Sequence, residues 1–164
     1  MTTRTEELPE LLARIPDTAI RALFSAEFIL CAEHFDRYTV EMLLRLTREL
    51  GLADSLRNGT TIAGLVRERA FAPRAEIPLR WFFRKLEAEG YLSREGEEPE
   101  ETYRSRGPMP PGDPEREERL AHAVDPRSAP PFAVVRAMVE HVPEFLRGEK
   151  TGEEILFSPA RLPL

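Results

Sequence analysis

Three stretches of helical periodicity, separated by turn residues, constrain the fold of this chain most strongly. In each stretch apolar side chains recur every three or four residues, as they do on the buried face of an amphipathic helix. The stretches cover residues 39–50, 61–70 and 78–89. Residues that favour turns or end helices lie between and after them, because glycine adopts left-handed conformations and proline cannot continue a helix. These residues are Gly51, Asn58, Gly59, Pro73 and Gly90.

Two strand-like segments follow Gly90, at residues 91–94 and 102–105. An acidic loop that contains Pro99 joins them, which is the pattern of a β-hairpin. Two helices in a helix-turn-helix followed by a hairpin make a winged helix. The sequence therefore predicts a mainly α protein: a winged helix-turn-helix with a small β-hairpin wing and additional flanking helices.

The chain ahead of this unit carries a further apolar stripe. Residues 1–35 form a predicted N-terminal helical segment, and the predicted winged-helix domain covers residues 36–106. Asp17 is a candidate N-cap for a helix over residues 18–33, and Thr39 is a candidate N-cap for the next helix. The apolar face of the first helix needs a partner surface and comprises Ile20, Leu23, Phe24, Phe28 and Cys31.

Proline marks the next boundary. Residues 107–114 contain four prolines and two glycines, so they cannot continue a helix or a sheet and we expect a semi-rigid linker. Residues 115–164 form the predicted C-terminal helical segment, with apolar residues at helical spacing up to a last turn around Phe145.

Charge and cysteine content limit the setting in which such a protein works. The chain has 32% charged residues and a net charge of −6, so it would repel a phosphate backbone as a whole. Its single Cys31 cannot form an internal disulfide, which fits a reducing compartment. No apolar run approaches the roughly 18 residues of a membrane span, and the first residues lack a signal-peptide pattern. We expect a cytoplasmic protein with no membrane contact, and nucleic acid is a disfavoured partner.

A DNA-binding transcriptional regulator remains the alternative interpretation of a winged helix. It requires basic side chains on the exposed face of residues 78–89, and the candidates are Arg74, Arg80, Arg84 and Lys85. The loop that would lie along a phosphate strand is acidic, however. Residues 60–106 hold nine basic and nine acidic residues, which leaves no net positive charge to release counterions.

No pattern indicates catalysis, cofactor binding or a metal site. The chain contains no glycine-rich phosphate loop and no nucleophile motif. We interpret residues 33–36 as a helix-end cluster, with His34 near the negative end of the helix dipole. Trp81 does not share the apolar face of its neighbours, and we expect it to cover a seam with another helix or domain.

Two groups of motifs resemble a known family. Residues 49–54, 61–65 and 85–92 resemble the N-terminal winged-helix region of S-adenosylmethionine-dependent methyltransferases. Residues 146–149 and 153–159 resemble the segment that leads into the methyltransferase domains of modular polyketide synthases.

This resemblance implies a noncatalytic adaptor or lid in a polyketide synthase methyltransferase or loading module, where it shapes access to a neighbouring catalytic domain. That domain would follow in the same polypeptide, with an acyl carrier protein as a candidate partner. The parent enzyme would use S-adenosylmethionine, whereas we expect no cofactor and no enzymatic activity in this chain alone. The candidate interface residues are Trp81, Phe145 and Phe157.

Overall fold

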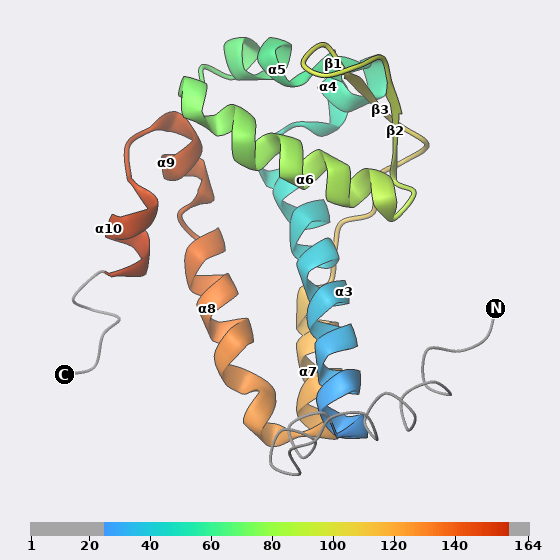
Figure 1. The fold of residues 1–164 in the computed structure, drawn as a ribbon, viewed down its shortest axis with the longest axis vertical. Helices are drawn as coiled ribbons and strands as arrows, with labels where there is room; N and C mark the ends of the chain where they lie inside the picture. Colours follow the sequence, from blue (N-terminus) through green and yellow to red (C-terminus); the bar gives the residue numbers. More distant parts are fainter. Residues whose placement is uncertain (1–24, 158–164) are drawn as a thin grey trace, which may run out of the picture.

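The computed structural model describes residues 25–157, which are mainly helical with one three-stranded antiparallel sheet (Figure 1). The helices are α3 (Ala26–Glu49), α4 (Ala53–Asn58), α5 (Ile62–Glu68), α6 (Glu76–Ala88), α7 (Pro114–Val124), α8 (Ala129–Val139), α9 (Val142–Arg147) and α10 (Gly152–Leu156). Two 3-10 turns are η1 (Pro73–Ala75) and η2 (Pro126–Ser128), and the strands are β1 (Thr60–Thr61), β2 (Leu92–Glu95) and β3 (Thr102–Ser105). The mainly α class is confirmed. Within residues 25–157, no helix has both the length and the apolarity needed to cross a membrane.

Helix α3 is a single long helix where the sequence suggested two. Its N-cap is Ser25, whose side-chain oxygen accepts a hydrogen bond from the Phe28 N–H at 3.2 Å. The expected cap at Thr39 was wrong, because Thr39 lies inside the helix and its hydroxyl donates to the Phe35 carbonyl at 3.0 Å. No glycine or proline lies between residues 26 and 49, so the helix continues across the predicted boundary at residue 36. The part of the expected helix before residue 25 lies outside the described residues.

The two helices predicted after Gly59 are confirmed. Thr61 caps α5, since its hydroxyl oxygen accepts a hydrogen bond from the Gly64 N–H at 3.0 Å. Pro73 begins the 3-10 turn that leads into α6, and Gly90, with a φ of 82°, follows the end of α6. The short elements α4 and β1 were not predicted, because six and two residues are too short to display a period.

The sheet closes the upper part of the molecule over one hydrophobic core. Strand β3 is central and pairs antiparallel with both β1 and β2, in the order β1-β3-β2. Tyr103 on β3 is fully buried, and its ring lies 5.3 Å from that of Phe83 on α6. The predicted hairpin is thereby confirmed as β2 and β3, and its inner face covers α6.

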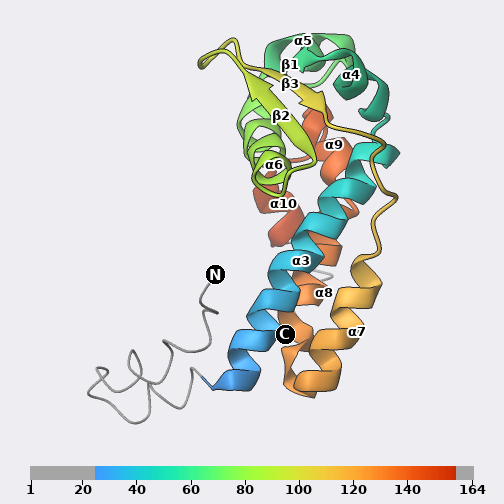
Figure 2. The same cartoon turned by 90° about the vertical axis from the view of Figure 1, so that its right-hand side faces the viewer.

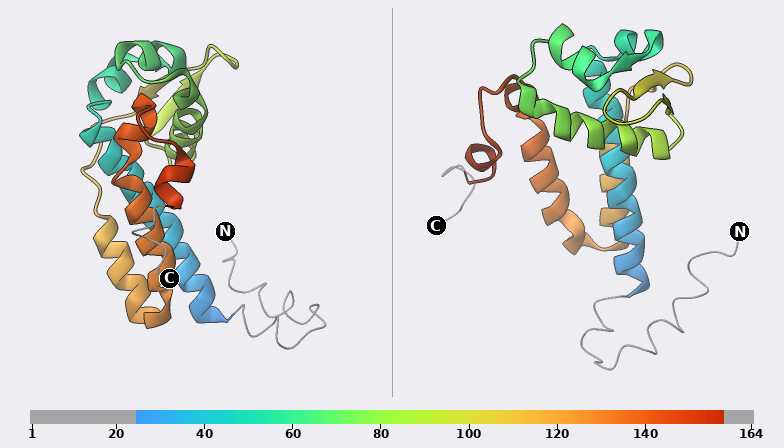
Figure 3. Two further views of the ribbon diagram at one scale, coloured as in Figure 1. Left: turned by 90° about the vertical axis from the view of Figure 1, so that its left-hand side faces the viewer. Right: turned by 45° about the horizontal axis from the view of Figure 1, so that its top comes forward.

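We call this upper part, with the sheet and the main core, the head. Helices α3, α7 and α8 form a stem that extends below it (Figure 1). Figures 2 and 3 show α7 beside α3. Helix α8 runs from the lower end of the stem up toward α9 and α6 (Figure 3). A second, smaller core joins them: Phe132 of α8 makes edge contacts with Tyr38 and Phe35 of α3, at 4.9 and 5.3 Å between ring centroids. Helix α7 therefore packs along the long α3, and α8 contacts both α3 and α7.

The proline-rich segment between β3 and α7 lies against α3. The Asp113 N–H donates to the Glu41 carboxylate at 2.8 Å, and Met109 packs on the main core. Gly112 has a φ of 76°, and a Cβ atom placed there would lie 2.3 Å from the Glu41 carbonyl oxygen. Only glycine allows the two backbones to approach so closely.

Candidate functional site

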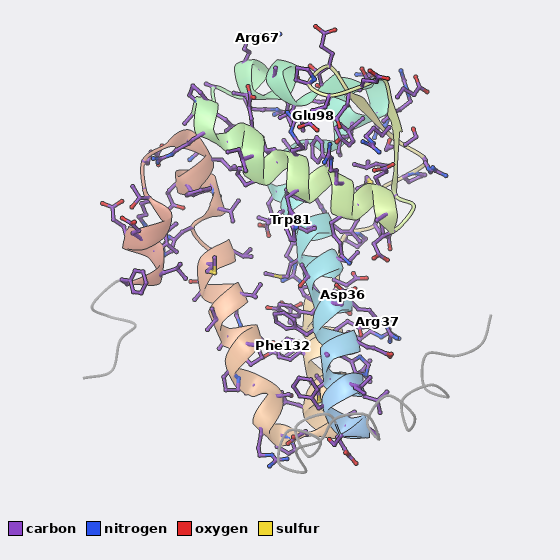
Figure 4. The ribbon with its side chains drawn as sticks, viewed as in Figure 1. Asp36, Arg37, Arg67, Trp81, Glu98 and Phe132 are labelled. Atoms are coloured by element: carbon purple, nitrogen blue, oxygen red, sulfur yellow. The ribbon has the colours of Figure 1, made fainter. Side chains whose placement is uncertain are left out.

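An almost wholly apolar groove lies beneath α6, and we call it the α6 groove. It encloses about 490 Å³ between α3, α6, α8, α9 and α10. Figure 4 shows Trp81 on the side of α6 that faces the space between α3 and α8. The lining residues are Phe35, Thr39, Met42, Leu43, Leu46, Pro78, Leu79, Trp81, Phe82, Val135, Met138, Val139, Val142, Phe145, Leu146, Gly152 and Ile155.

Helix α6 places its apolar residues in two directions. Leu79, Phe83 and Leu86 are fully buried in the main core, as the spacing of the sequence predicts. Trp81 lies off that face and is 57% exposed, although it borders the groove. A half-exposed indole at the edge of an apolar groove is typical of a contact surface, because tryptophan is enriched where two proteins meet.

The opposite wall of the groove is held in place by contacts to η1. The Ala72 N–H donates to the Leu146 carbonyl of α9 at 2.8 Å. Arg74 donates to the Lys150 carbonyl at 2.9 Å, and its guanidinium lies 5.8 Å from the centre of the Phe145 ring. These contacts connect α9 and the loop before α10 to the start of α6, so both walls of the groove belong to one packed unit.

The groove offers almost no hydrogen-bonding chemistry. Thr39 and Trp81 supply its only polar side-chain groups, a hydroxyl and an indole N–H. The Thr39 hydroxyl already donates to the Phe35 carbonyl. Among residues 25–157, no carboxylate, imidazole, amine or thiol lines the groove. Its chemistry therefore suits an apolar surface and supplies neither an acid nor a base. Within residues 25–157, no cluster of three or more histidine, cysteine or acidic residues could hold a metal ion.

Two of the three candidate interface residues line this groove, and the third lies outside it. Trp81 and Phe145 both line it, from α6 and α9. Phe157 follows α10, is 65% exposed and is not part of the lining. Sequence reasoning missed the contribution of α8, where Val135, Met138 and Val139 form a wall. Their helical spacing is visible in the sequence, but which surface they face depends on the tertiary packing.

Two of the candidate DNA-contacting residues bind the acidic loop of the hairpin. Glu101 is only 1% exposed, and its carboxylate accepts hydrogen bonds from Arg80 at 2.5 Å and from Arg84 at 2.8 Å. Glu98 adds a second contact to Arg84 at 2.8 Å. Burial raises the pKa of Glu101, but hydrogen bonds from Arg84 and Arg94 outweigh it and lower the pKa overall. The hairpin loop thus neutralises the basic face of α6.

The other two candidates are also engaged within the protein. Arg74 bonds to the Lys150 carbonyl, as described above. The Lys85 amine contacts the Asp36 carboxylate at 2.9 Å and the Glu89 carboxylate at 3.1 Å. All four cations therefore have anionic or carbonyl partners, and the geometry does not favour the DNA-binding interpretation.

His34 does not lie at a helix end. It occupies the interior of α3, where its Nδ1 atom lies 2.9 Å from the carboxylate of Glu117, a residue of α7 that is 5% exposed. The interpretation of His34 as a partner of a helix dipole was therefore wrong. Because α3 continues past residue 36, His34 joins α3 to α7 and Asp36 joins α3 to α6 through Lys85.

Comparisons with known proteins place the fold. The chain matches no protein-family model and no curated protein. The crystal structure of the DszA carbon methyltransferase is similar, with a TM-score of 0.65, 22% identity and coverage of 95% of this chain and 36% of that chain. The crystal structure of the selenomethionine-substituted CurJ carbon methyltransferase has a TM-score of 0.64, 12% identity and coverage of 93% and 38%. The chain thus shares the fold of a part of these enzymes and spans less than two fifths of their lengths.

Proposed function

We propose that this chain is a noncatalytic helical subdomain of a carbon methyltransferase, and that it acts as a lid or adaptor for a neighbouring catalytic domain. The α6 groove is the observation that carries the proposal. It is a large apolar surface with a half-exposed tryptophan at its edge, in a fold that matches only part of two larger methyltransferases. Such a surface fits a contact with another domain of the same polypeptide.

The lining of the groove supports a covering role. A lid assists a reaction by excluding water and shaping the path of the substrate, and it needs no acid or base of its own. The groove has that character, since its walls are aliphatic and aromatic side chains. In a polyketide synthase module, where the substrate is an acyl chain carried by an acyl carrier protein, these walls would border the entrance to the catalytic domain.

The lining of the α6 groove does not fit S-adenosylmethionine. This cofactor carries an amino acid group, a sulfonium and ribose hydroxyls, and burying them requires several hydrogen-bonding partners. The α6 groove offers the Trp81 indole N–H and a Thr39 hydroxyl that is already bonded. The sheet of residues 25–157 is antiparallel and has three strands, whereas dinucleotide-type sites form at the ends of parallel strands. In this proposal the cofactor belongs to the neighbouring domain.

We assign the unit from α4 to β3 to the winged-helix class, and we propose that the basic face of α6 packs within this unit and does not bind DNA. Its element order and the α5–α6 pair support that class. Its hairpin loop contributes Glu98 and Glu101 to the basic face of α6, so that face stabilises the unit and has no free charge for phosphate.

Paired substitutions on α6 test the proposal. Trp81 borders the groove, whereas Ile77 is 79% exposed on the same helix and does not line it. In a polypeptide that includes the residues encoded after Leu164, Trp81→Ser should lower methyl transfer by about tenfold or more, because anchor residues at an interface carry most of its binding energy. Ile77→Ser should leave the rate unchanged.

Both substitutions should leave the thermal midpoint of the 164-residue chain within about 2 °C, since each replaces an exposed side chain. Equal rates for the two variants of the longer polypeptide would contradict the lid role. A coding sequence that stops directly after Leu164, with no partner polypeptide that binds the groove, would contradict the subdomain proposal itself.

A further inference from the structure

A second hollow lies at the lower end of α3, and we call it the stem hollow. It encloses about 610 Å³ between the start of α3 and the start of α8. Its apolar lining comes from Phe28, Cys31, Ala32, Phe35, Pro131 and Phe132, and its polar lining from Ser25, Asp125, Arg127 and Ser128. It shares only Phe35 with the α6 groove, so the two features belong to different ends of the stem.

The charged residues of the stem hollow are paired with each other, and among its hydroxyls that of Ser128 is buried without a hydrogen-bond partner within residues 25–157. Arg127 and Asp125 form an ion pair at 3.0 Å, and the Ser25 hydroxyl oxygen accepts from the Phe28 N–H. Their charges therefore offer little to a polar ligand. The apolar side chains remain as the recognition surface, which suits an occupant with apolar side chains.

The chain itself enters at the edge of this hollow. Ser25 lines the hollow and is the N-cap of α3, with an extended backbone at φ −67° and ψ 163°. Twenty-four residues precede Ser25. The last eight of them, residues 17–24, contain the apolar residues Ile20, Leu23 and Phe24 at helical spacing, and Asp17 is a candidate N-cap.

We propose that residues 17–24 dock in the stem hollow through Ile20, Leu23 and Phe24. As a helix, eight residues span about 12 Å, a length suited to the lower turns of two neighbouring helices. The direct covalent connection at Ser25 gives the segment an effective concentration in the millimolar range, whereas a second copy of the chain would have to bind from dilute solution. The inference does not depend on the proposed lid function.

Cys31 makes the inference testable because it lines the hollow and is the only cysteine of the chain. The measurement is the rate at which its thiol reacts with dithiobis(nitrobenzoate) in the full chain. Docking should slow the reaction, and the Leu23→Ser/Phe24→Ser double variant should accelerate it by about tenfold or more, since the reagent then meets an open hollow. The milder Ile20→Ala variant should accelerate it by roughly threefold.

The matched control is the Leu8→Ser/Leu11→Ser double variant, which changes apolar residues of the same terminal stretch outside residues 17–24. It should react at the unmodified rate. Circular dichroism and Trp81 fluorescence verify that each variant retains its fold. Equal rates in the unmodified chain, the Leu23→Ser/Phe24→Ser variant and the Ile20→Ala variant would overturn the proposal. So would a rate in the unmodified chain that rises on dilution, because it would place a second copy in the hollow.

Discussion

Gly112 provides the most specific test of how the proline-rich segment is attached to α3. In the Gly112→Ala variant, the new Cβ atom would lie 2.3 Å from the Glu41 carbonyl oxygen and 2.9 Å from the Arg45 backbone nitrogen. Both neighbours are backbone atoms of α3, so no side chain can move aside to make room. The segment must therefore separate from α3 or shift it.

The expected cost has two parts. A left-handed φ costs an alanine about 1 kcal/mol more than a glycine, and the smaller entropy of the unfolded alanine chain offsets part of it. Displacement of the segment breaks the bond between the Asp113 N–H and Glu41 and opens packing around Met109, which adds about 2 kcal/mol. The sum is about 2–3 kcal/mol, or a decrease of about 4–12 °C in the thermal midpoint for a domain of this size.

Two control variants separate these parts in the same thermal and urea unfolding assays. Gly90 has a φ of 82° but no atom within 4 Å of its would-be Cβ, so Gly90→Ala reports the backbone cost alone. Gly107 has open space as well and no left-handed φ, so Gly107→Ala should change stability by less than about 0.5 kcal/mol. If Gly112→Ala is no more destabilising than Gly90→Ala, the close approach of the segment to α3 is refuted.

Three further predictions concern the charges of the head. Glu101→Gln should cost about 3 kcal/mol in urea unfolding because it removes the buried anion that Arg80, Arg84 and Arg94 share. Glu98→Gln, at a 56% exposed side chain, should cost less than about 1 kcal/mol. The folded-state pKa of Glu101 lies below its ordinary value of 4.5. The stabilising contribution of Glu101 is therefore present above pH 4.5 and is lost as the pH falls through the folded-state pKa. A measurement of the unfolding free energy against pH should show this loss, and the loss should be smaller in the Glu101→Gln variant. A gel shift at low salt should detect no DNA binding by the unmodified chain. If the chain does bind DNA, and if Arg80→Glu and Arg84→Glu weaken that binding, the result would support the regulator alternative.

Local signals were sufficient to predict the helix pair and the hairpin. Thr61, Pro73 and Gly90 act through their own backbone and neighbouring residues, so their positions in the sequence predict the start of α5, the turn before α6 and the end of α6. Periodicity similarly identified Leu79 and Leu86 as core residues, and both are fully buried.

Tertiary contacts explain what the sequence did not predict. The polar residues His34 and Asp36 suggested a helix end, yet they contact Glu117 and Lys85 on other helices and lie inside α3. Helical periodicity shows that a residue belongs to an apolar face but not which helix that face meets. The division of the chain into four segments, and the roles assigned to Trp81 and Phe145, therefore remain predictions.

The central claim is that a neighbouring domain covers the α6 groove, and hydrogen–deuterium exchange tests it most directly. The measurement compares the 164-residue chain with a polypeptide extended through the residues encoded after Leu164. We predict that amides of residues 140–157 and of the α6 turn around Trp81 exchange about tenfold or more slowly in the extended polypeptide, while those of β3 exchange at the same rate in both. Equal exchange of residues 140–157 in the two polypeptides would contradict the account.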